Sequence, residues 1–417
     1  MKSHYVLIGL CATFLFRSTA AAASTDAKPE AVGMSAERLR RVDDFVERLL
    51  ADHKLAGAVT VVARRGQTVS LTAHGYADLA AKRPMRSDDL FHLQSMAKPI
   101  LTVATLILLE EGRFLLSDPV EKYLPEFRNL KVAVPKSSDP AGYDLIPAER
   151  PITLLDLLTH RTGFPGLPAD HGPAEALARE ARQSLPAHED YTLEEFVRKR
   201  ATLPLSRQPG TAYRYSDTNA DVMGRIIEVV SGRTLEEFFR ERIFAPLTMN
   251  DTYFSVPPEK RARVASVYTR SPENKLVRLP ADPLTTRFFS AGGNLYSTPT
   301  DYLQFCEMLL NGGELNGHRL LSRKSIELMT AYQTDSVAPF MRGQYIGLNV
   351  AVQKVDGASG LLGSPGTYGW AGSYCTYFRI DPQEKLILLF FTQQEFSAEG
   401  RNITYGFQNT VMQAITD

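Results

Sequence analysis

Ser95 and Lys98 are the residues of this sequence whose types and spacing most directly permit chemistry. They lie in the segment FHLQSMAKPILTVATLILLEEGRF, residues 91–114, and Ser95 is the only serine with a lysine three residues after it. Three residues apart on a helix, the two side chains share a face, so the amine can contact the hydroxyl. A serine becomes a useful nucleophile only beside a base, and lysine acts as one when its pKa is lowered. A helix-capping serine followed by a solvent-directed lysine explains the same spacing without chemistry, so the pair alone does not decide.

Two later segments carry further candidate groups. YRYSD at residues 213–217 offers the phenol of Tyr215 for proton exchange, with a packed core aromatic as the alternative interpretation. TYGWAGSYCTY at residues 367–377 contains Ala371 and Gly372, which are small enough for a ligand to lie against the strand. The amide of Ser373 could then join that of Ser95 in holding an oxyanion, and a simple glycine bend is the alternative.

The segment around Ser95 is predicted to be a buried helix. Residues 100–109 are almost wholly apolar, which is typical of a helix between two layers rather than one on the surface. Pro99 fits the first turn, where no intrahelical donor is needed. A serine at the start of a helix also lies near the positive end of the helix dipole, which favours a developing anion.

Both ends of the chain predict the same sheet. A helix from Ser35 to His53 precedes a hairpin, and a second hairpin precedes a final helix at residues 399–415. The strands expected in these hairpins are Gly57–Ala63, Thr68–Ala73, Ser373–Ile380 and Lys385–Thr392. We therefore expect an α+β fold, an α/β sandwich in which helices flank one antiparallel sheet built from both chain ends.

The middle of the chain is predicted to be a mostly helical insertion at residues 117–284, between sheet regions at 33–116 and 285–417. The helices expected there are Thr153–His160, Thr192–Arg200, Asn219–Val230 and Thr234–Phe244. Residues 135–150 and 162–180 are rich in Pro and Gly and are interpreted as loops that overhang a cleft.

The first residues are predicted to form a signal peptide. Lys2 precedes the short apolar run YVLIGLCATFLF, and STAAAAS offers cleavage sites, most plausibly after Ala23. Residues 1–23 are then removed, residues 24–417 form the mature domain, and the product is secreted or periplasmic without a stable membrane anchor. Cys306 and Cys375 would be the remaining cysteines, and two buried free thiols are favoured over a disulfide.

Composition argues against several function classes. Lys and Arg total 47 and so do Asp and Glu, so no overall positive field favours nucleic acid. The eight histidines are scattered and form no H-E-x-x-H motif, so we expect neither a metal nor another cofactor. No G-x-S-x-G is present, which excludes an α/β-hydrolase nucleophile elbow.

The order of the three segments resembles the β-lactamase-related serine hydrolases. S-x-x-K, then Y-S-D, then W-A-G before a C-terminal hairpin is similar to that group, which includes class C β-lactamases, penicillin-binding proteins and family VIII carboxylesterases. LLTHRTGFPG and FSAGGNLYSTPTDYLQF support the resemblance, which covers nearly all of the mature chain. It implies a β-lactamase/transpeptidase-like fold. It also implies roles for single residues. Ser95, Lys98 and Tyr215 would be catalytic, and the amides of Ser95 and Ser373 would form the oxyanion hole. Substrate binding would fall to Asp217, Trp370, Ala371 and Gly372, while His160 and Thr162 would be structural.

Two departures from the family pattern shape the expected function. Trp370 stands where lactamases have the charged residue of K-T-G, so charge recognition is lost there and neutral, apolar groups are favoured. Asp217 replaces Asn and can pair with Lys98, which would raise the lysine pKa and leave more of the base role to Tyr215. The expected function is an exported serine hydrolase that cleaves small neutral carboxylic esters through an acyl-enzyme on Ser95. The alternatives are a weak β-lactamase or D-alanyl-D-alanine peptidase, an acyltransferase, and a catalytically silent binding module.

Overall fold

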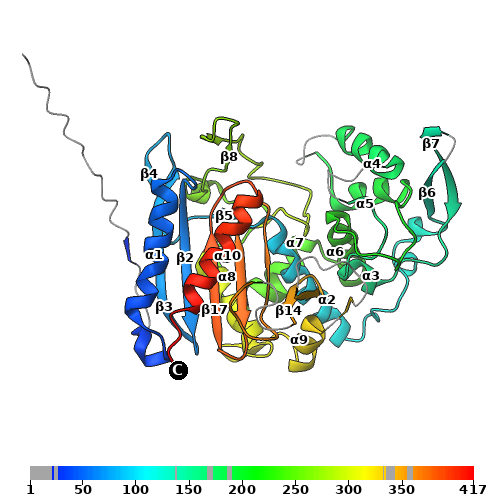
Figure 1. Ribbon diagram of the computed structural model, residues 1–417. Helices are drawn as coiled ribbons and strands as arrows, with labels where there is room; N and C mark the ends of the chain where they lie inside the picture. Colours follow the sequence, from blue (N-terminus) through cyan, green and yellow to red (C-terminus); the bar gives the residue numbers. More distant parts are fainter. Residues whose placement is uncertain are drawn as a thin grey trace, which may run out of the picture.

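One antiparallel sheet organises the molecule. The computed structural model describes residues 21–22, 27–136, 139–166, 172–185, 190–331, 333–334, 343–354 and 360–417. The sheet has nine strands in the order β1-β3-β2-β17-β16-β15-β14-β13, with β4 paired to β3 (Figure 1). Its strands are β1 (Ala21–Ala22), β2 (Gly57–Arg64), β3 (Gln67–Asp78), β4 (Arg83–Pro84), β13 (Gln344–Ile346), β14 (Ala351–Gln353), β15 (Tyr368–Ala371), β16 (Tyr377–Asp381) and β17 (Leu386–Phe391). The chain ends meet at the centre, because β17 pairs with β2.

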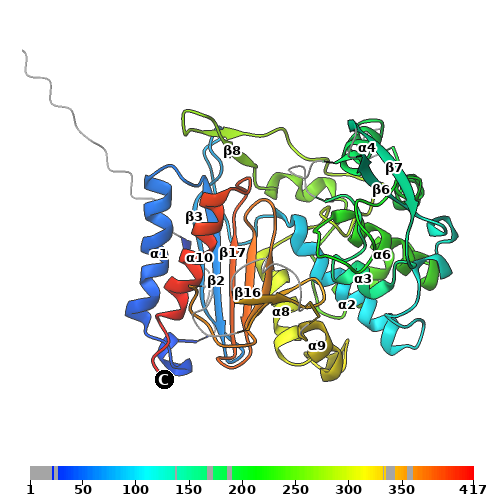
Figure 2. The same ribbon diagram turned by 45° about the vertical axis from the view of Figure 1, so that its right-hand side comes forward.

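The central strands are buried on both faces, which explains why they are apolar at nearly every position. In β17, Ile387, Leu389 and Phe391 pack into the larger core, while Leu386, Leu388 and Phe390 pack into the smaller one. The smaller core lies under α1 (Ala36–Ala51) and α10 (Ala398–Met412), and the larger one under α2 (Ala97–Glu110) and α8 (Pro299–Leu310). Figure 2 shows these helices on opposite sides of the sheet. The predicted α+β fold class is confirmed.

Most elements predicted at the chain ends are present, but the predicted start of one strand was wrong. Ser35 caps α1 by accepting from the amide of Arg38, as expected of a helix that starts there. The expected strand Ser373–Ile380 begins only at Tyr377. Residues 372–376 turn instead, because the Gly372 amide donates to the Thr376 carbonyl at 2.8 Å and Cys375 has a left-handed φ of 59°.

The stretch between α2 and α8 contains the predicted helices together with elements that the sequence did not reveal. Its helices are α3 (Leu154–Leu158), α4 (Pro173–Gln183), α5 (Leu193–Ala201), α6 (Asp217–Ser231) and α7 (Leu235–Phe239). The predicted capping box of Thr234 with Glu237 is present. Its paired strands are β6 (Lys131–Lys136) with β7 (Asp139–Pro147) and β8 (Tyr268–Arg270) with β9 (Leu276–Arg278).

Two expected loops are therefore corrected. Residues 135–150 contribute to the β6–β7 hairpin, which the prolines at 135 and 140 concealed because proline normally argues against a strand. Residues 162–180 include the start of α4, where Pro173 occupies the first turn. Proline is well tolerated at that position, so it marked a helix start rather than a loop.

Short paired strands and a helix complete the side of the sheet that carries α2. β5 (Phe91–His92) pairs with β10 (Tyr296–Ser297), and β11 (Glu314–Leu315) pairs with β12 (His318–Arg319). α9 (Arg323–Thr330) follows. The β5–β10 pair matters most for function, because β5 leads directly into the segment that carries Ser95.

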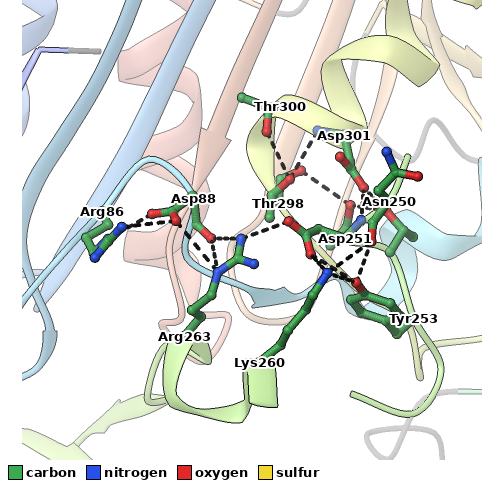
Figure 3. A network of polar contacts seen from close by, with 12 residues as sticks. Arg86, Asp88, Asn250, Asp251, Tyr253, Lys260, Arg263, Thr298, Thr300 and Asp301 are labelled. Atoms are coloured by element: carbon green, nitrogen blue, oxygen red, sulfur yellow. Dashed lines mark hydrogen bonds and ion pairs between the residues drawn. The ribbon is translucent and has the colours of Figure 1, made fainter. Parts of the chain in front are cut away.

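A polar network ties the end of the insertion to the start of α8. Asp251 accepts from Lys260 at 2.5 Å and from Arg263 at 3.0 Å, and its own amide donates to Asp301 at 2.7 Å (Figure 3). Tyr253 donates to the same Asp251 carboxylate at 2.9 Å. The network is one polar attachment between the insertion and the sheet region.

The predicted signal peptide lies almost entirely outside the described residues, apart from Ala21 and Ala22 in β1. Within the described part of the chain, we find no helix long and apolar enough to cross a membrane. Cys306 and Cys375 are both buried and free, as predicted.

Candidate active site

Ser95 lies in a tight turn between β5 and α2. The turn is a short 3-10 helix at Gln94–Met96, and α2 follows at once, so Lys98 falls in the first turn of α2 with Pro99 beside it. Gln94 has a left-handed φ of 51°, an uncommon conformation for a residue with a side chain. The hydroxyl of Tyr302 donates to the Met96 carbonyl at 3.0 Å and holds the turn from below.

Lys98 is wholly buried and uses every hydrogen it has. Its Nζ lies 3.0 Å from Ser95 Oγ, 2.7 Å from Asp217 Oδ1 and 2.6 Å from the Gly292 carbonyl. An ammonium has three N–H donors, so these three acceptors satisfy it completely. The geometry therefore fits a charged lysine rather than a free amine.

Asp217 accounts for that charge state. It opens helix α6, and its side chain is 53% exposed toward a cavity although the chain surrounds it closely on the other sides. Burial alone would lower the pKa of Lys98, but Asp217 and Tyr215 together raise it above its usual range. Burial would likewise raise the pKa of Asp217, yet Lys98 holds it below its usual range. The pairing expected from the sequence is present, and both partners are ionised at neutral pH.

Tyr215 is the second group in contact with the serine. Its hydroxyl lies 2.7 Å from Ser95 Oγ, and Lys98 Nζ lies 5.0 Å from the centre of its ring. Burial raises the pKa of Tyr215, while the nearby Lys98 ammonium opposes that rise. The phenol is thus predominantly protonated at neutral pH, and the ammonium stabilises the phenolate whenever it forms.

The W-A-G segment lies beside these groups. Trp370 is 6% exposed and stacks on Tyr215, with the ring centres 6.0 Å apart. Gly372 packs so closely that an added Cβ would lie 2.3 Å from the Leu93 carbonyl, two residues before Ser95. Thr376 donates to that same carbonyl at 3.0 Å.

This close approach explains the glycine at position 372 differently from the sequence analysis, which expected it to leave room for a ligand. Its lack of a side chain lets the nucleophile segment itself approach, rather than a ligand. Ala371 ends β15 and is half-buried, and Ser373 is exposed on the turn that follows. The Ser373 carbonyl accepts from Phe396 at 2.7 Å, which fixes the orientation of this turn.

His160 and Thr162 lie behind the site. Asn219 Nδ2 is 3.0 Å from His160 Nδ1, and Thr162 donates to Asn219 at 2.7 Å. The His160 ring lies 4.5 Å from that of Tyr215, and burial lowers the pKa of His160 to about 3. A neutral, buried imidazole that supports the segment around Tyr215 agrees with the structural role expected of it.

A group of residues that the sequence analysis missed connects three parts of the site. His92 Nε2 lies 2.7 Å from the Gly293 carbonyl, and its Nδ1 lies 2.8 Å from Asp282. Tyr374, next to Ser373, donates to the same Asp282 oxygen at 2.9 Å. Gly293 adjoins Gly292, whose carbonyl accepts from Lys98. The only available signal was the position of His92, three residues before Ser95.

A cavity of about 350 Å³ opens on the insertion side of the site. Gln94, Asp217, Gly292 and Gly293 form the part nearest to Ser95. The rest of its wall comes from α4, α5, α6 and the segment around Phe288. The cavity reaches the site through Gln94, the residue before Ser95, and through Asp217, which contacts Lys98.

Comparisons with known proteins show the family to which this chain belongs. The Beta-lactamase family model matches residues 42–409. Protein Rv1367c of Mycobacterium tuberculosis is 37% identical over 81% of this chain and 86% of its own. Esterase EstB of Burkholderia gladioli is 30% identical over 94% of this chain and 99% of its own.

Among solved structures, EstCE1, described as a hydrolase with promiscuous acyltransferase activity, superposes with a TM-score of 0.76 at 23% identity. It covers 90% of this chain and 99% of its own. With the fold, the family match and the esterase relative in agreement, this chain belongs to the β-lactamase family, among its serine hydrolases.

Proposed function

We propose that the protein hydrolyses carboxylic esters through an acyl-enzyme on Ser95. The observation that carries the proposal is the position of Ser95 Oγ, 2.7 Å from the Tyr215 hydroxyl and 3.0 Å from Lys98 Nζ. The kinship with Esterase EstB supports the ester as the bond cleaved.

Tyr215 is the proton carrier in this proposal, because Lys98 has no free lone pair. The reacting form is the minor fraction in which Tyr215 has lost its proton to solvent and the Lys98 ammonium stabilises its phenolate. In that form Ser95 Oγ attacks the ester carbonyl carbon while its proton passes to the phenolate oxygen of Tyr215. The amides of Ser95 and Ser373 hold the tetrahedral oxyanion. As the intermediate collapses, the bond to the alcohol oxygen breaks and Tyr215 returns the proton to that oxygen.

Deacylation repeats the sequence with water. Water attacks the acyl carbon and gives a proton to Tyr215, and the bond to Ser95 Oγ breaks as that oxygen takes the proton back. The carboxylic acid leaves and the resting state is restored. Asp217 keeps Lys98 charged throughout, so the lysine acts as a fixed cation.

Trp370 supports a neutral group on the tyrosine side of the site. Its indole stacks on Tyr215 and brings no charge, so this position has no cation to attract a carboxylate and suits a neutral alcohol part. β-Lactams carry a carboxylate that a cation in this position would recognise. Trp370 therefore favours esters over β-lactams and D-alanyl-D-alanine peptides.

Transfer of the acyl group to an alcohol is the second candidate. It uses the same acyl-enzyme with an alcohol in place of water, and the description of EstCE1 as a hydrolase with promiscuous acyltransferase activity favours its inclusion. Product analysis with an added alcohol separates the two reactions, because only transfer yields a new ester.

The deciding experiment compares nitrophenyl esters and a chromogenic cephalosporin on one preparation. We expect rapid ester turnover, slow cephalosporin turnover, and loss of both in Ser95→Ala. Ser231→Ala, at the end of α6, is the control and should retain full activity. Ester turnover that survives Ser95→Ala excludes the mechanism, and a predominance of cephalosporin turnover makes the protein a β-lactamase. If a fluorophosphonate probe leaves the folded protein unlabelled, a binding role replaces catalysis.

We also propose that the protein is exported, on the strength of Lys2 and the apolar run that follows it. Amino-terminal sequencing of protein recovered from outside the cytoplasm should begin at Ser24. Recovery from the cytoplasm with residues 1–23 intact would contradict export.

A further inference from the structure

The cavity beside Ser95 has an unusual concentration of arginine. Arg179 and Arg182 reach it from α4, and Arg200 from the end of α5. Figure 1 shows α4 lying over α5 and α6, so these guanidinium groups come from the elements that cover the site. Within the described part of the chain, none of the three forms an ion pair with a carboxylate.

Arg200 is the most constrained of the three. It is half-buried, with Nη2 3.1 Å from Thr218 Oγ1 and Nη1 3.5 Å from the Ala178 carbonyl. Burial and the nearby Arg182 lower the pKa of Arg200 to about 10, and Asp221 only partly opposes this. Some arginines elsewhere in the insertion are paired, as Arg225 is with Glu194 at 2.6 Å and Arg150 is with Asp156 at 2.6 Å.

The carboxylates around the cavity do not cancel this charge. Asp217 is committed to Lys98 at 2.7 Å. Asp221 accepts from Ser290, and burial raises the pKa of Asp221 to about 7, so it is protonated in part at neutral pH. Among the described residues of the cavity wall, Glu175 is the remaining acid, against three arginines. The described residues thus give the cavity a net positive charge. Arg179 and Arg182 are exposed, so the desolvation cost of that charge falls on half-buried Arg200, and a bound anion would offset it.

The same cavity also has apolar walls. Leu185, Tyr191, Phe196 and Phe288 line it together with Ala178. Such a surface suits a short hydrocarbon chain, and the arginines suit a carboxylate, which guanidinium binds in a bidentate manner. The fit is to a group that has an apolar stem and an anionic end.

The position of Tyr215 decides which part of the substrate enters. Tyr215 must reach the leaving alcohol oxygen, and its ring stacks on Trp370, so the alcohol lies on that side of Ser95. The acyl chain then points away from Trp370, toward Gln94, Asp217 and Gly292, where the cavity opens. We propose that the preferred substrates are esters whose acyl chain ends in a carboxylate, which Arg182 and Arg200 bind. This inference rests on the proposed ester hydrolysis and refines it: the alcohol part is neutral and the acyl part is anionic.

The test uses two nitrophenyl esters of matched length, a monoester of glutaric acid and an ester of pentanoic acid. We expect kcat/KM to be at least about tenfold higher for the glutarate monoester, because a charge-assisted bidentate contact is made only by that ester. The preference should fall as salt is added, since Arg182 is exposed.

Substitutions assign the preference to the arginines. Arg182→Gln and Arg200→Gln should each reduce the ratio of the two kcat/KM values severalfold, mainly by raising KM for the glutarate monoester. Arg198→Gln is the matched control, because Arg198 lies on the same helix as Arg200 but is 68% exposed and paired with Glu194. It should leave the ratio unchanged. Arg182 is exposed, so its replacement tests the proposal even if Arg200→Gln fails to fold.

Two different failures remain distinguishable. A wild-type ratio of one or less, or a ratio unaffected by both Arg182→Gln and Arg200→Gln, overturns the anionic acyl chain and leaves ester hydrolysis standing. If neither ester is turned over, or if Ser95→Ala retains turnover, the proposed function itself fails.

Discussion

Two clusters of this molecule contain the same three side-chain types in similar contact. The first cluster is Lys98, Tyr215 and Asp217, and the second is Lys260, Tyr253 and Asp251 (Figure 3). Each lysine bonds its aspartate, at 2.7 Å in the first cluster and 2.5 Å in the second. Each also lies over its tyrosine ring, at 5.0 Å and 5.2 Å from the ring centre.

The clusters differ in burial and in what the tyrosine hydroxyl contacts. The Lys98 side chain is wholly buried, whereas 30% of the Lys260 side chain is exposed. The Tyr253 hydroxyl donates to Asp251 at 2.9 Å, while the Tyr215 hydroxyl lies 2.7 Å from Ser95 Oγ. In the second cluster every polar group is used to hold segments together. In the first, the tyrosine has a partner that can take or give a proton, so the same residue types serve chemistry instead of attachment.

The largest effect should come from removing the two tyrosine hydroxyls in turn. Tyr215→Phe removes the proposed proton carrier, and we expect kcat/KM for a nitrophenyl ester to fall by about 10³-fold. Tyr253→Phe should change the same constant by less than about twofold, because it alters only a distant attachment. Equal losses in both variants would show that the hydroxyls matter through folding alone.

The second comparison replaces each aspartate and follows activity with pH. Burial lowers the pKa of Lys98, and the Asp217 carboxylate is the main group that raises it. Asp217→Asn removes that carboxylate, so the pKa of Lys98 falls. The same change lowers the pKa of Tyr215, because the Asp217 charge raises that pKa as well. A base therefore becomes available at lower pH. We expect the rising limb of kcat/KM to move down by about one pH unit or more. Asp251→Asn should leave the limb in place, and an unmoved limb in Asp217→Asn would contradict the proposed charge state of Lys98.

A third test concerns the backbone carbonyl that each lysine contacts. Lys98 lies 2.6 Å from the Gly292 carbonyl, and Lys260 lies 3.4 Å from that of Asn250. His92 holds the neighbouring Gly293, so His92→Gln should loosen this acceptor and lower kcat by about tenfold. KM should change little, because His92 does not line the cavity beside Ser95. A loss confined to KM would contradict this positioning role.

The smallest effect concerns stability in acid. Arg263, Lys260 and Tyr253 outweigh burial and lower the pKa of Asp251 to about 2. A lowered carboxyl pKa stabilises the fold above the unfolded value near 3.8, and that contribution disappears as pH falls through about 2. Asp251→Asn should therefore cost up to about 2 kcal/mol of unfolding free energy at neutral pH and almost nothing near pH 2. Urea unfolding at several pH values measures the difference, and a constant difference would contradict it.

Sequence patterns predicted the fold class and the Ser95–Lys98 contact well, because both depend on local spacing. The apolar runs of β2 and β17 and the helical spacing in α2 left few alternatives. The pairing of Asp217 with Lys98 also followed from residue chemistry, once the family resemblance placed the two residues together.

The rest depends on contacts between segments far apart in the chain, which no local pattern encodes. His92 meets Asp282 only because β5 lies near the segment before β10. Arg182 and Arg200 share a cavity only because α4 folds over α5, and the Pro and Gly residues before and at the start of α4 predict a loop there instead. The prediction of a strand at residues 373–376 was wrong for a similar reason. A hydrogen bond from Thr376 to the distant Leu93 carbonyl helps to hold the turn at 372–376.

The place of β17 at the centre of the sheet has a consequence for how the chain folds. Leu389 pairs with Val61, so a strand synthesised late completes the pairing of one that is more than 300 residues earlier in the sequence. Until β17 has emerged from the ribosome, β2 has an unpaired edge, and the larger core under α2 lacks the side chains that β17 contributes. Contacts this distant in sequence form slowly. A ribosome-bound fragment that lacks β17 and α10 should therefore remain accessible to protease, and a reactive Ser95 should arise only after β17 has paired with β2.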